Sequence, residues 1–182
     1  MTDTTGAATT GRSRMVTGLF KDRDSAEKAY GALGTRGYGK DDVNLMMTDD
    51  TRKKYFSDTD NKGSELDTKA WEGAGKGAAI GGTVGATLAA LAAIGTSVAL
   101  PGIGLLVAGP LAAALAGAGA GAATGGLVGA LVGHGIPEDR AKEYEAGVKN
   151  GGVVMGVNAR SDEDADYFEN EFRSSHGENI YR

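Results

Sequence analysis

Several residue types are absent or scarce in this 182-residue chain, and each scarcity excludes a class of protein. There is no cysteine, which excludes disulfide frameworks and thiolate chemistry. The formal net charge is −5, and no cluster of lysine and arginine interleaved with aromatics occurs, so nucleic acid is not expected as a partner. The only imidazoles are His134 and His176, which stand far apart without a carboxylate cluster at metal-ligand spacing. We therefore expect no metal and no cofactor.

Charged side chains are also missing from one long internal stretch, residues 77–133. A charge-free middle between polar flanks predicts one folded domain interrupted by an insert. The expected parts are a disordered tail over 1–13, a first half-domain over 14–48, a polar linker over 49–72, the insert over 73–135 and a second half-domain over 136–182.

What the insert does contain is a small residue at every fourth position, in two runs that mirror each other about Ile103. Positions four apart lie along one face of an α-helix, so each run would leave a smooth face on which another backbone can pack closely. The pattern predicts an antiparallel helical hairpin, a glycine zipper. Its expected helix-packing residues are Gly73, Gly77, Gly81, Gly85, Ala89 and Ala93 in the first arm, and Gly109, Ala113, Gly117, Gly121, Gly125, Gly129 and Gly133 in the second.

The bend between the two arms is the most apolar part of the insert. As a helix, the 23-residue arm over 77–99 would be about 34 Å long, enough to cross a hydrocarbon layer of about 30 Å. Each arm has only about six large aliphatic side chains, so insertion of one arm alone would be marginal. The bend itself is expected to be a membrane tip formed by Leu100, Pro101, Ile103, Leu105, Leu106 and Val107.

Two interpretations of the insert remain open. In the first, the hairpin associates with lipid on the cytoplasmic face of the bacterial inner membrane, with Trp71 and Lys76 as interface anchors, and copies then oligomerise along the glycine faces. In the second, the protein is a cytoplasmic scaffold in which the hairpins of several copies bury one another without lipid. Both interpretations make the protein a homo-oligomer. Trp71 is equally well explained as a residue that packs onto the folded domain instead of anchoring at a membrane interface.

The flanks repeat a strand, helix, strand pattern. Residues 14–20 form an apolar run, Asp22 or Asp24 can cap a following helix, and 42–47 form a second apolar run. After the insert, Pro137 opens a helix, and a further strand, a helix and a short strand follow over 153–157, 162–172 and 179–181. We therefore expect an α/β (α+β) fold, a ferredoxin-like β-α-β repeat with helices on one face of the sheet, split by the insert.

Three segments come close to chemical motifs and depart from them. Residues 34–41 have the spacing of a phosphate-binding loop, but Asp41 replaces the required Ser or Thr and the segment follows a helix, so a helix end with Gly34 or Gly37 at positive φ is expected. Residues 58–63 begin like a calcium loop, but Lys62 occupies a ligand position. The acidic run over 162–171 is expected to be the solvated face of a helix. No catalytic constellation and no small-molecule substrate is identified, so the chain is not expected to be an enzyme.

A family resemblance rests on the two flanks. The sequences VTGLFxDRDSAEKA and DDVNLM before the insert, and IPEDRAKEYEAGVKNGGVVMGV after it, resemble the heat-induced general stress protein domain of bacteria, the YflT-like group. The similarity covers residues 14–48 and 136–174. It implies a bacterial stress-response protein that carries a Gly/Ala-rich insert, and it implies no catalytic residue.

Overall fold

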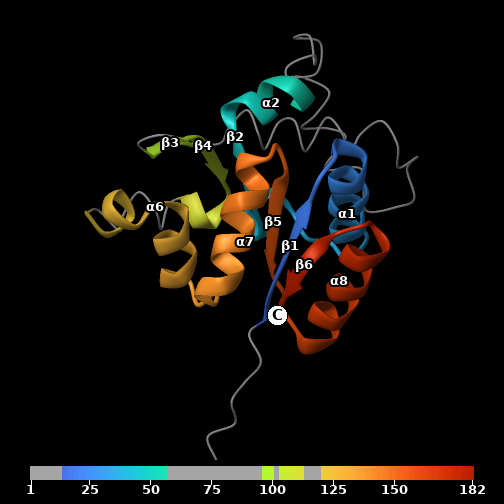
Figure 1. The fold of residues 1–182 in the computed structure, drawn as a ribbon. Coiled ribbons are helices and arrows are strands. Elements are labelled where there is room, and N and C mark those ends of the chain that lie inside the picture. The colour runs from blue at the N-terminus through green and yellow to red at the C-terminus, as the bar shows by residue number, and fades with distance from the viewer. Residues whose placement is uncertain (1–13, 57–95, 101–102, 113–119) are drawn as a thin grey trace, which may run out of the picture.

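The protein is described by a computed structural model over residues 14–56, 96–100, 103–112 and 120–182. These residues form a mixed α/β fold around one antiparallel sheet of six strands (Figure 1). The strand order is β3-β4-β2-β5-β1-β6, so every pair of neighbouring strands except β3 and β4 joins distant parts of the chain.

The first half-domain contains the strands and helix that the sequence predicts. Strand β1 (Met15–Phe20), helix α1 (Arg23–Thr35) and strand β2 (Val43–Thr48) follow one another. Asp22 caps α1, because its carboxylate accepts a hydrogen bond of 2.8 Å from the Ser25 N–H. Gly37, at φ +71°, turns the chain after α1, and a single 3-10 turn at Lys40–Asp42 leads into β2. The expected helix end with a glycine at positive φ is confirmed, and it occupies the segment with phosphate-loop spacing.

The second half-domain also has the expected elements. Helix α7 (Glu138–Lys149) is followed by β5 (Val153–Asn158), helix α8 (Asp162–Ser174) and the short strand β6 (Glu178–Tyr181). Strand β5 lies between β1 and β2 and is antiparallel to both. The two flanks of the sequence therefore build one sheet.

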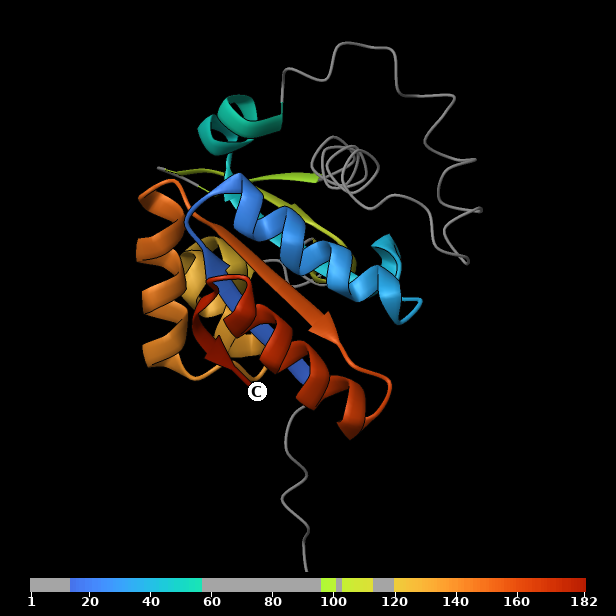
Figure 2. The ribbon, with the colours of Figure 1, turned by 90° about the vertical axis from the view of Figure 1, so that its right-hand side faces the viewer.

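Helices cover both faces of the sheet, where the sequence led us to expect helices on one face. Helices α1 and α8 lie side by side on the first face (Figure 2), where Phe20 and Phe172 make an edge-to-face contact at 5.3 Å. Helices α6 and α7 cover the second face, with Leu131 and Tyr144 packed in its core. Because both faces are covered, the inner strands β1, β2 and β5 are buried at nearly every position.

The bend of the insert is a β-hairpin. Strands β3 (Thr96–Leu100) and β4 (Ile103–Ala108) pair with each other, and β4 extends the sheet by pairing with β2. The expected helix over residues 96–99 is therefore wrong, because these residues belong to β3. The expected membrane tip is contradicted at Leu105, Leu106 and Val107, whereas the side chains of Leu100 and Ile103 are not described. Leu105, Leu106 and Val107 are at most 3% exposed and belong to the two cores, because successive side chains of a strand point to opposite faces. A strand buried on both faces has the same apolar composition as a segment in lipid.

The residues after β2 form a helix where a polar linker was expected. Helix α2 spans Asp49–Phe56, and Phe56 joins the core beneath α1. The Thr51 N–H donates to the Thr48 hydroxyl at 3.0 Å, and acidic residues in the first turn and lysines in the last turn complement the helix dipole. The linker therefore does not begin at residue 49.

Helix α6 (Ala120–Gly133) lies within the expected second arm and is helical, as predicted for these residues. A kink interrupts it at Gly126, whose φ of +57° is not helical. Within the described ranges, no helix combines the length and the apolar composition needed to cross a bilayer.

Candidate functional site at the junction of the insert and the sheet

Many residues of the predicted sites lie outside the described residues. Side chains are not described for Leu100, Ile103, Gly121 and Gly125, although these residues lie in β3, β4 and α6. Outside the description are Gly73, Gly77, Gly81, Gly85, Ala89, Ala93, Ala113, Gly117, Trp71, Lys76 and Pro101. The near-calcium loop at 58–63 and the tail at 1–13 also lie there.

Gly109 was predicted to be a helix-packing residue, and it instead forms the tight turn after β4. Its φ is +94°, in a region that side chains disfavour. A Cβ added to Gly109 would lie 2.0 Å from the backbone oxygen of Val43. Glycine is required here because the chain leaving β4 runs directly against the backbone of β2.

Asn44 holds the start of the next helical turn against the same strand. This residue is 3% exposed and is the polar exception in the apolar run of β2. Its side-chain oxygen accepts a hydrogen bond of 2.7 Å from the N–H of Leu111. Pro110 and Leu111 begin a helix, whose first N–H groups have no partner within the helix. Asn44 therefore supplies from the sheet the cap that fixes the insert in place.

One side of helix α6 is buried and the other is exposed. Leu127, Ala130 and Leu131 are buried against the sheet and α7. Gly129 and Gly133, two members of the predicted zipper face, are exposed. Val132 lies between them at 42% exposure and is the one large exposed hydrophobic side chain found in the described part of the chain.

The whole of α6 carries no charged residue. A surface helix of a soluble protein ordinarily has charged or polar residues on the side away from the core. The outward side of α6, defined here as Gly129, Val132 and Gly133, lacks them. We call these three residues the α6 outer face.

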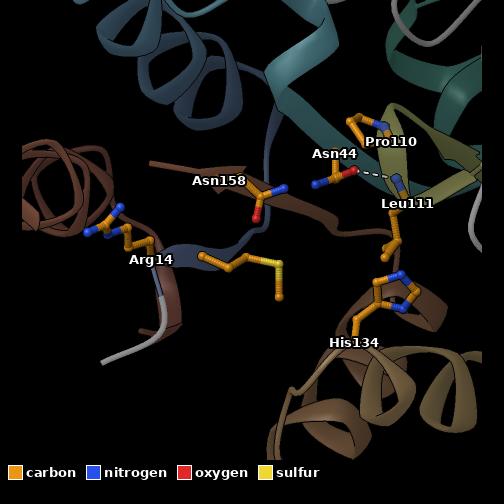
Figure 3. A pocket seen from close by; sticks show the side chains of 7 residues that line it. Arg14, Asn44, Pro110, Leu111, His134 and Asn158 are labelled. Carbon is orange, nitrogen blue, oxygen red and sulfur yellow. Dashed lines mark hydrogen bonds between the residues drawn. The ribbon is translucent and has the colours of Figure 1, made fainter. Parts of the chain in front are cut away.

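A pocket of about 310 Å³ opens where the insert meets the sheet (Figure 3). The ends of β1, β2 and β5, the turn after β4 and the residue after α6 contribute its lining. The lining residues are Arg14, Met15, Asn44, Pro110, Leu111, His134 and Asn158. His134, at the C-terminal end of α6, contacts the carbonyl oxygen of Ala130 through Nδ1 at 3.1 Å.

A buried polar network lies on the same face of the sheet. The Tyr144 hydroxyl donates to the carbonyl of Asn179 at 2.6 Å and lies 2.8 Å from the hydroxyl of Thr17. Burial raises the pKa of Tyr144 to about 12. The hydroxyls of this network are hydrogen-bonded within the protein, so the network holds α7, β1 and β6 together.

A second network joins the loop after α1 to the start of α8. The Tyr38 hydroxyl donates to Asp164 at 2.7 Å and accepts from the Arg160 N–H at 2.6 Å. The Tyr38 hydrogen bond lowers the pKa of Asp164, and Arg36 pairs with the same carboxylate at 2.8 Å. The remaining acidic side chains of α8 are largely on its solvated side, as expected.

Within the described ranges, no three His, Cys, Asp or Glu side chains come together in a group that could hold a metal ion. His134 and His176 lie at different places, after α6 and after α8.

Comparison with known proteins gives no relative. No family model, no curated protein and no solved structure matches this chain. The site must be interpreted from its own geometry.

Sequence reasoning missed the pocket and its central residue, Asn44. The available signal was an asparagine inside a run of apolar residues over 43–47, since a buried amide needs a hydrogen-bond partner. The identity of that partner could not be inferred, because Leu111 lies 67 residues away.

Proposed function

We propose that this protein is a non-enzymatic bacterial stress-response protein that associates with further copies of itself through the α6 outer face. In this proposal the sheet domain is a ferredoxin-like fold and the glycine-rich insert is its assembly element. The observation that carries the proposal is an uncharged, glycine-lined helix face on the surface of a chain whose flanks are highly charged.

The strand order supports the ferredoxin-like interpretation. Without β3 and β4, the sheet has the order β2-β5-β1-β6 and is antiparallel throughout. Two β-α-β units that interleave in this way, with α1 and α8 on one face, match the split β-α-β arrangement. The resemblance of the flanks to the heat-induced general stress protein domain is the basis for the proposed stress-response role.

The α6 outer face supports a second copy as the partner. Gly129 and Gly133 lie four residues apart, so another helix can approach the backbone closely beside the Val132 side chain. An uncharged contact also avoids bringing two chains of net charge −5 together through like charges. A copy of the same helix provides the matching face through a two-fold axis.

Lipid is less favoured as the partner at the apolar bend, because Leu105, Leu106 and Val107 are buried among protein side chains. The other residues on which lipid contact was based, the first arm with Trp71 and Lys76, lie outside the described residues. Association with the cytoplasmic membrane is therefore an outcome that the test must distinguish from self-association.

The test compares two glycine substitutions that the fold tolerates. A Cβ at Gly133 or at Gly34 has no atom within 4 Å, and both residues lie near the C-terminal end of a helix. Gly133→Leu blocks the α6 outer face, and Gly34→Leu is the matched control on α1. Sedimentation equilibrium should show self-association of the unmodified protein, weakened at least about tenfold by Gly133→Leu and unchanged by Gly34→Leu.

Two results would contradict this proposal. A chain that stays monomeric at all concentrations would exclude self-association, and equal behaviour of both variants would exclude the α6 outer face. A monomer that floats with lipid vesicles and loses this property in Gly133→Leu would replace the second copy with a membrane.

A further inference from the structure

The pocket at the junction has the size of a small-molecule site. Its volume is about 310 Å³, roughly twice that of an engineered protein cavity of about 150 Å³ that holds benzene. Met15, Pro110 and Leu111 supply apolar lining, and the polar groups come from separate elements. A few polar groups converging on an apolar cavity are typical of ligand sites.

The hydrogen bond of Asn44 decides which of its atoms is available to a ligand. The Leu111 N–H can only donate, so the Asn44 atom that it contacts is the carbonyl oxygen. The Asn44 amide nitrogen is then the other end of the side chain, and Figure 3 shows Asn44 lying between Leu111 and Asn158. Asn44 therefore offers a donor at the pocket.

The contact of His134 with the Ala130 carbonyl shows which ring nitrogen carries the proton. The Ala130 carbonyl can only accept, so Nδ1 of His134 carries the proton in this contact. Nε2 is the remaining polar atom of the ring. In Figure 3 the ring of His134 points from the end of α6 toward Leu111.

The polar side chains of the pocket are mainly donors. No carboxylate is among its lining residues. Arg14 pairs with Asp162 at 3.4 Å, and Figure 3 shows its guanidinium pointing away from the other lining side chains, so Arg14 supplies no charge to the interior of the pocket. Asn158 lies at the end of β5, directly opposite Met15 in the sheet register. Two amide donors with no carboxylate beside them favour an anionic group.

We propose that this pocket binds a small carboxylate with an apolar body of about ten to thirteen non-hydrogen atoms. The carboxylate lies toward Asn44 and Asn158, and the apolar body lies against Met15, Pro110 and Leu111. This binding is separate from the proposed self-association, because no residue of the α6 outer face lines the pocket.

The probe is 3-phenylpropanoate, and 3-phenylpropanamide is its neutral counterpart. A ligand of about eleven non-hydrogen atoms at ordinary efficiency binds with a dissociation constant on the order of millimolar. Titration of the full chain, followed by two-dimensional amide NMR, should shift the side-chain amides of Asn44 and Asn158 and the Leu111 N–H. The carboxylate should bind at least about tenfold more tightly than the amide, because donors to a charged group contribute more.

Asn158→Asp places a negative charge in the pocket without changing side-chain size. Asn158 is exposed, so the fold tolerates the change, and Asn170→Asp adds the same charge on the exposed side of α8 as a control. We expect Asn158→Asp to weaken carboxylate binding about tenfold or more and to leave amide binding nearly unchanged.

Three results would overturn the inference. The first is equal affinity for the two probes, and the second is an absence of amide shifts at a carboxylate concentration of about 20 mM, well above the expected dissociation constant. The third is an equal loss of binding in Asn158→Asp and Asn170→Asp. Self-association is measured without the probe, so failure of this inference is distinguishable from failure of the proposed function.

Discussion

Gly109→Ala tests whether the insert is built into the sheet through the turn after β4. An alanine at φ +94° carries a conformational cost of about 1 to 3 kcal/mol. Its Cβ would lie 2.0 Å from the Val43 oxygen, which forces the two backbones apart. Overpacking of this kind costs about 1 to 3 kcal/mol more. The expected loss of unfolding free energy is therefore about 2 to 6 kcal/mol, a large part of the roughly 5 to 15 kcal/mol of a typical domain.

The assay is urea unfolding followed by far-UV circular dichroism, with Gly37→Ala as the matched control. Gly37 has a similar φ of +71°, but a Cβ there would have no atom within 4 Å. The control therefore carries the conformational cost alone, about 1 to 2 kcal/mol. Equal losses in the two variants would refute the reasoning, because Gly109 would then have no close contact with Val43.

Three further predictions concern polar side chains that are hydrogen-bonded within the fold. Asn44→Ala should cost about 1 to 3 kcal/mol and speed hydrogen exchange of the Leu111 N–H, because that donor loses its buried acceptor; unchanged exchange would argue against the cap. Tyr144→Phe should cost about 1 kcal/mol at neutral pH and reduce alkaline destabilisation, measured by urea unfolding across pH. The raised pKa of Tyr144 means that its contribution is present below the unfolded value of about 10 and is lost as pH rises through about 12. Asp164→Asn should reduce the loss of unfolding free energy at acidic pH, measured by the same urea unfolding across pH. The lowered pKa of Asp164 gives stability that is present above about pH 4 and lost at lower pH. A variant that loses as much unfolding free energy at acidic pH as the unmodified protein would contradict this.

The flanks could be predicted from the sequence because their signals are local. Asp22 and Ser161 stand directly before helices and cap them through the N–H groups of Ser25 and Asp164. Gly37 ends a helix at a position where a positive φ is needed. Signals of this kind act within a few residues, so a sequence without structural information reveals them.

The bend of the insert was misinterpreted because its decisive contacts are distant. A small residue at every fourth position fits a helix, and a short apolar run such as 103–108 fits a buried strand or a buried helix equally well. Residues 103–108 form a strand because they pair with β2, through partners such as Met46 and Val107 that are 61 residues apart in the sequence. Gly109 illustrates the same limit, since its position in the four-residue series suggested helix packing and its contact with Val43 requires a turn.

The pocket depends on distant contacts in the same way. Asn44, Leu111, His134 and Asn158 become neighbours only when the insert packs against the sheet. Each of these residues is unremarkable in its own stretch of sequence. The α6 outer face differs, because the absence of charge over 77–133 was visible from the sequence and pointed to a contact surface.

The measurement that tests the proposed self-association most directly is a distance between two copies of α6. The chain contains no cysteine, so Val132→Cys gives a single attachment point for a spin label on the α6 outer face. Packed helices lie about 8 to 10 Å apart, so pulsed electron paramagnetic resonance should find a label-to-label distance below about 25 Å in the self-associated protein. The same label at Asn170→Cys, on the exposed side of α8, should give a longer distance or none. A short distance at residue 170 with none at residue 132 would contradict the account.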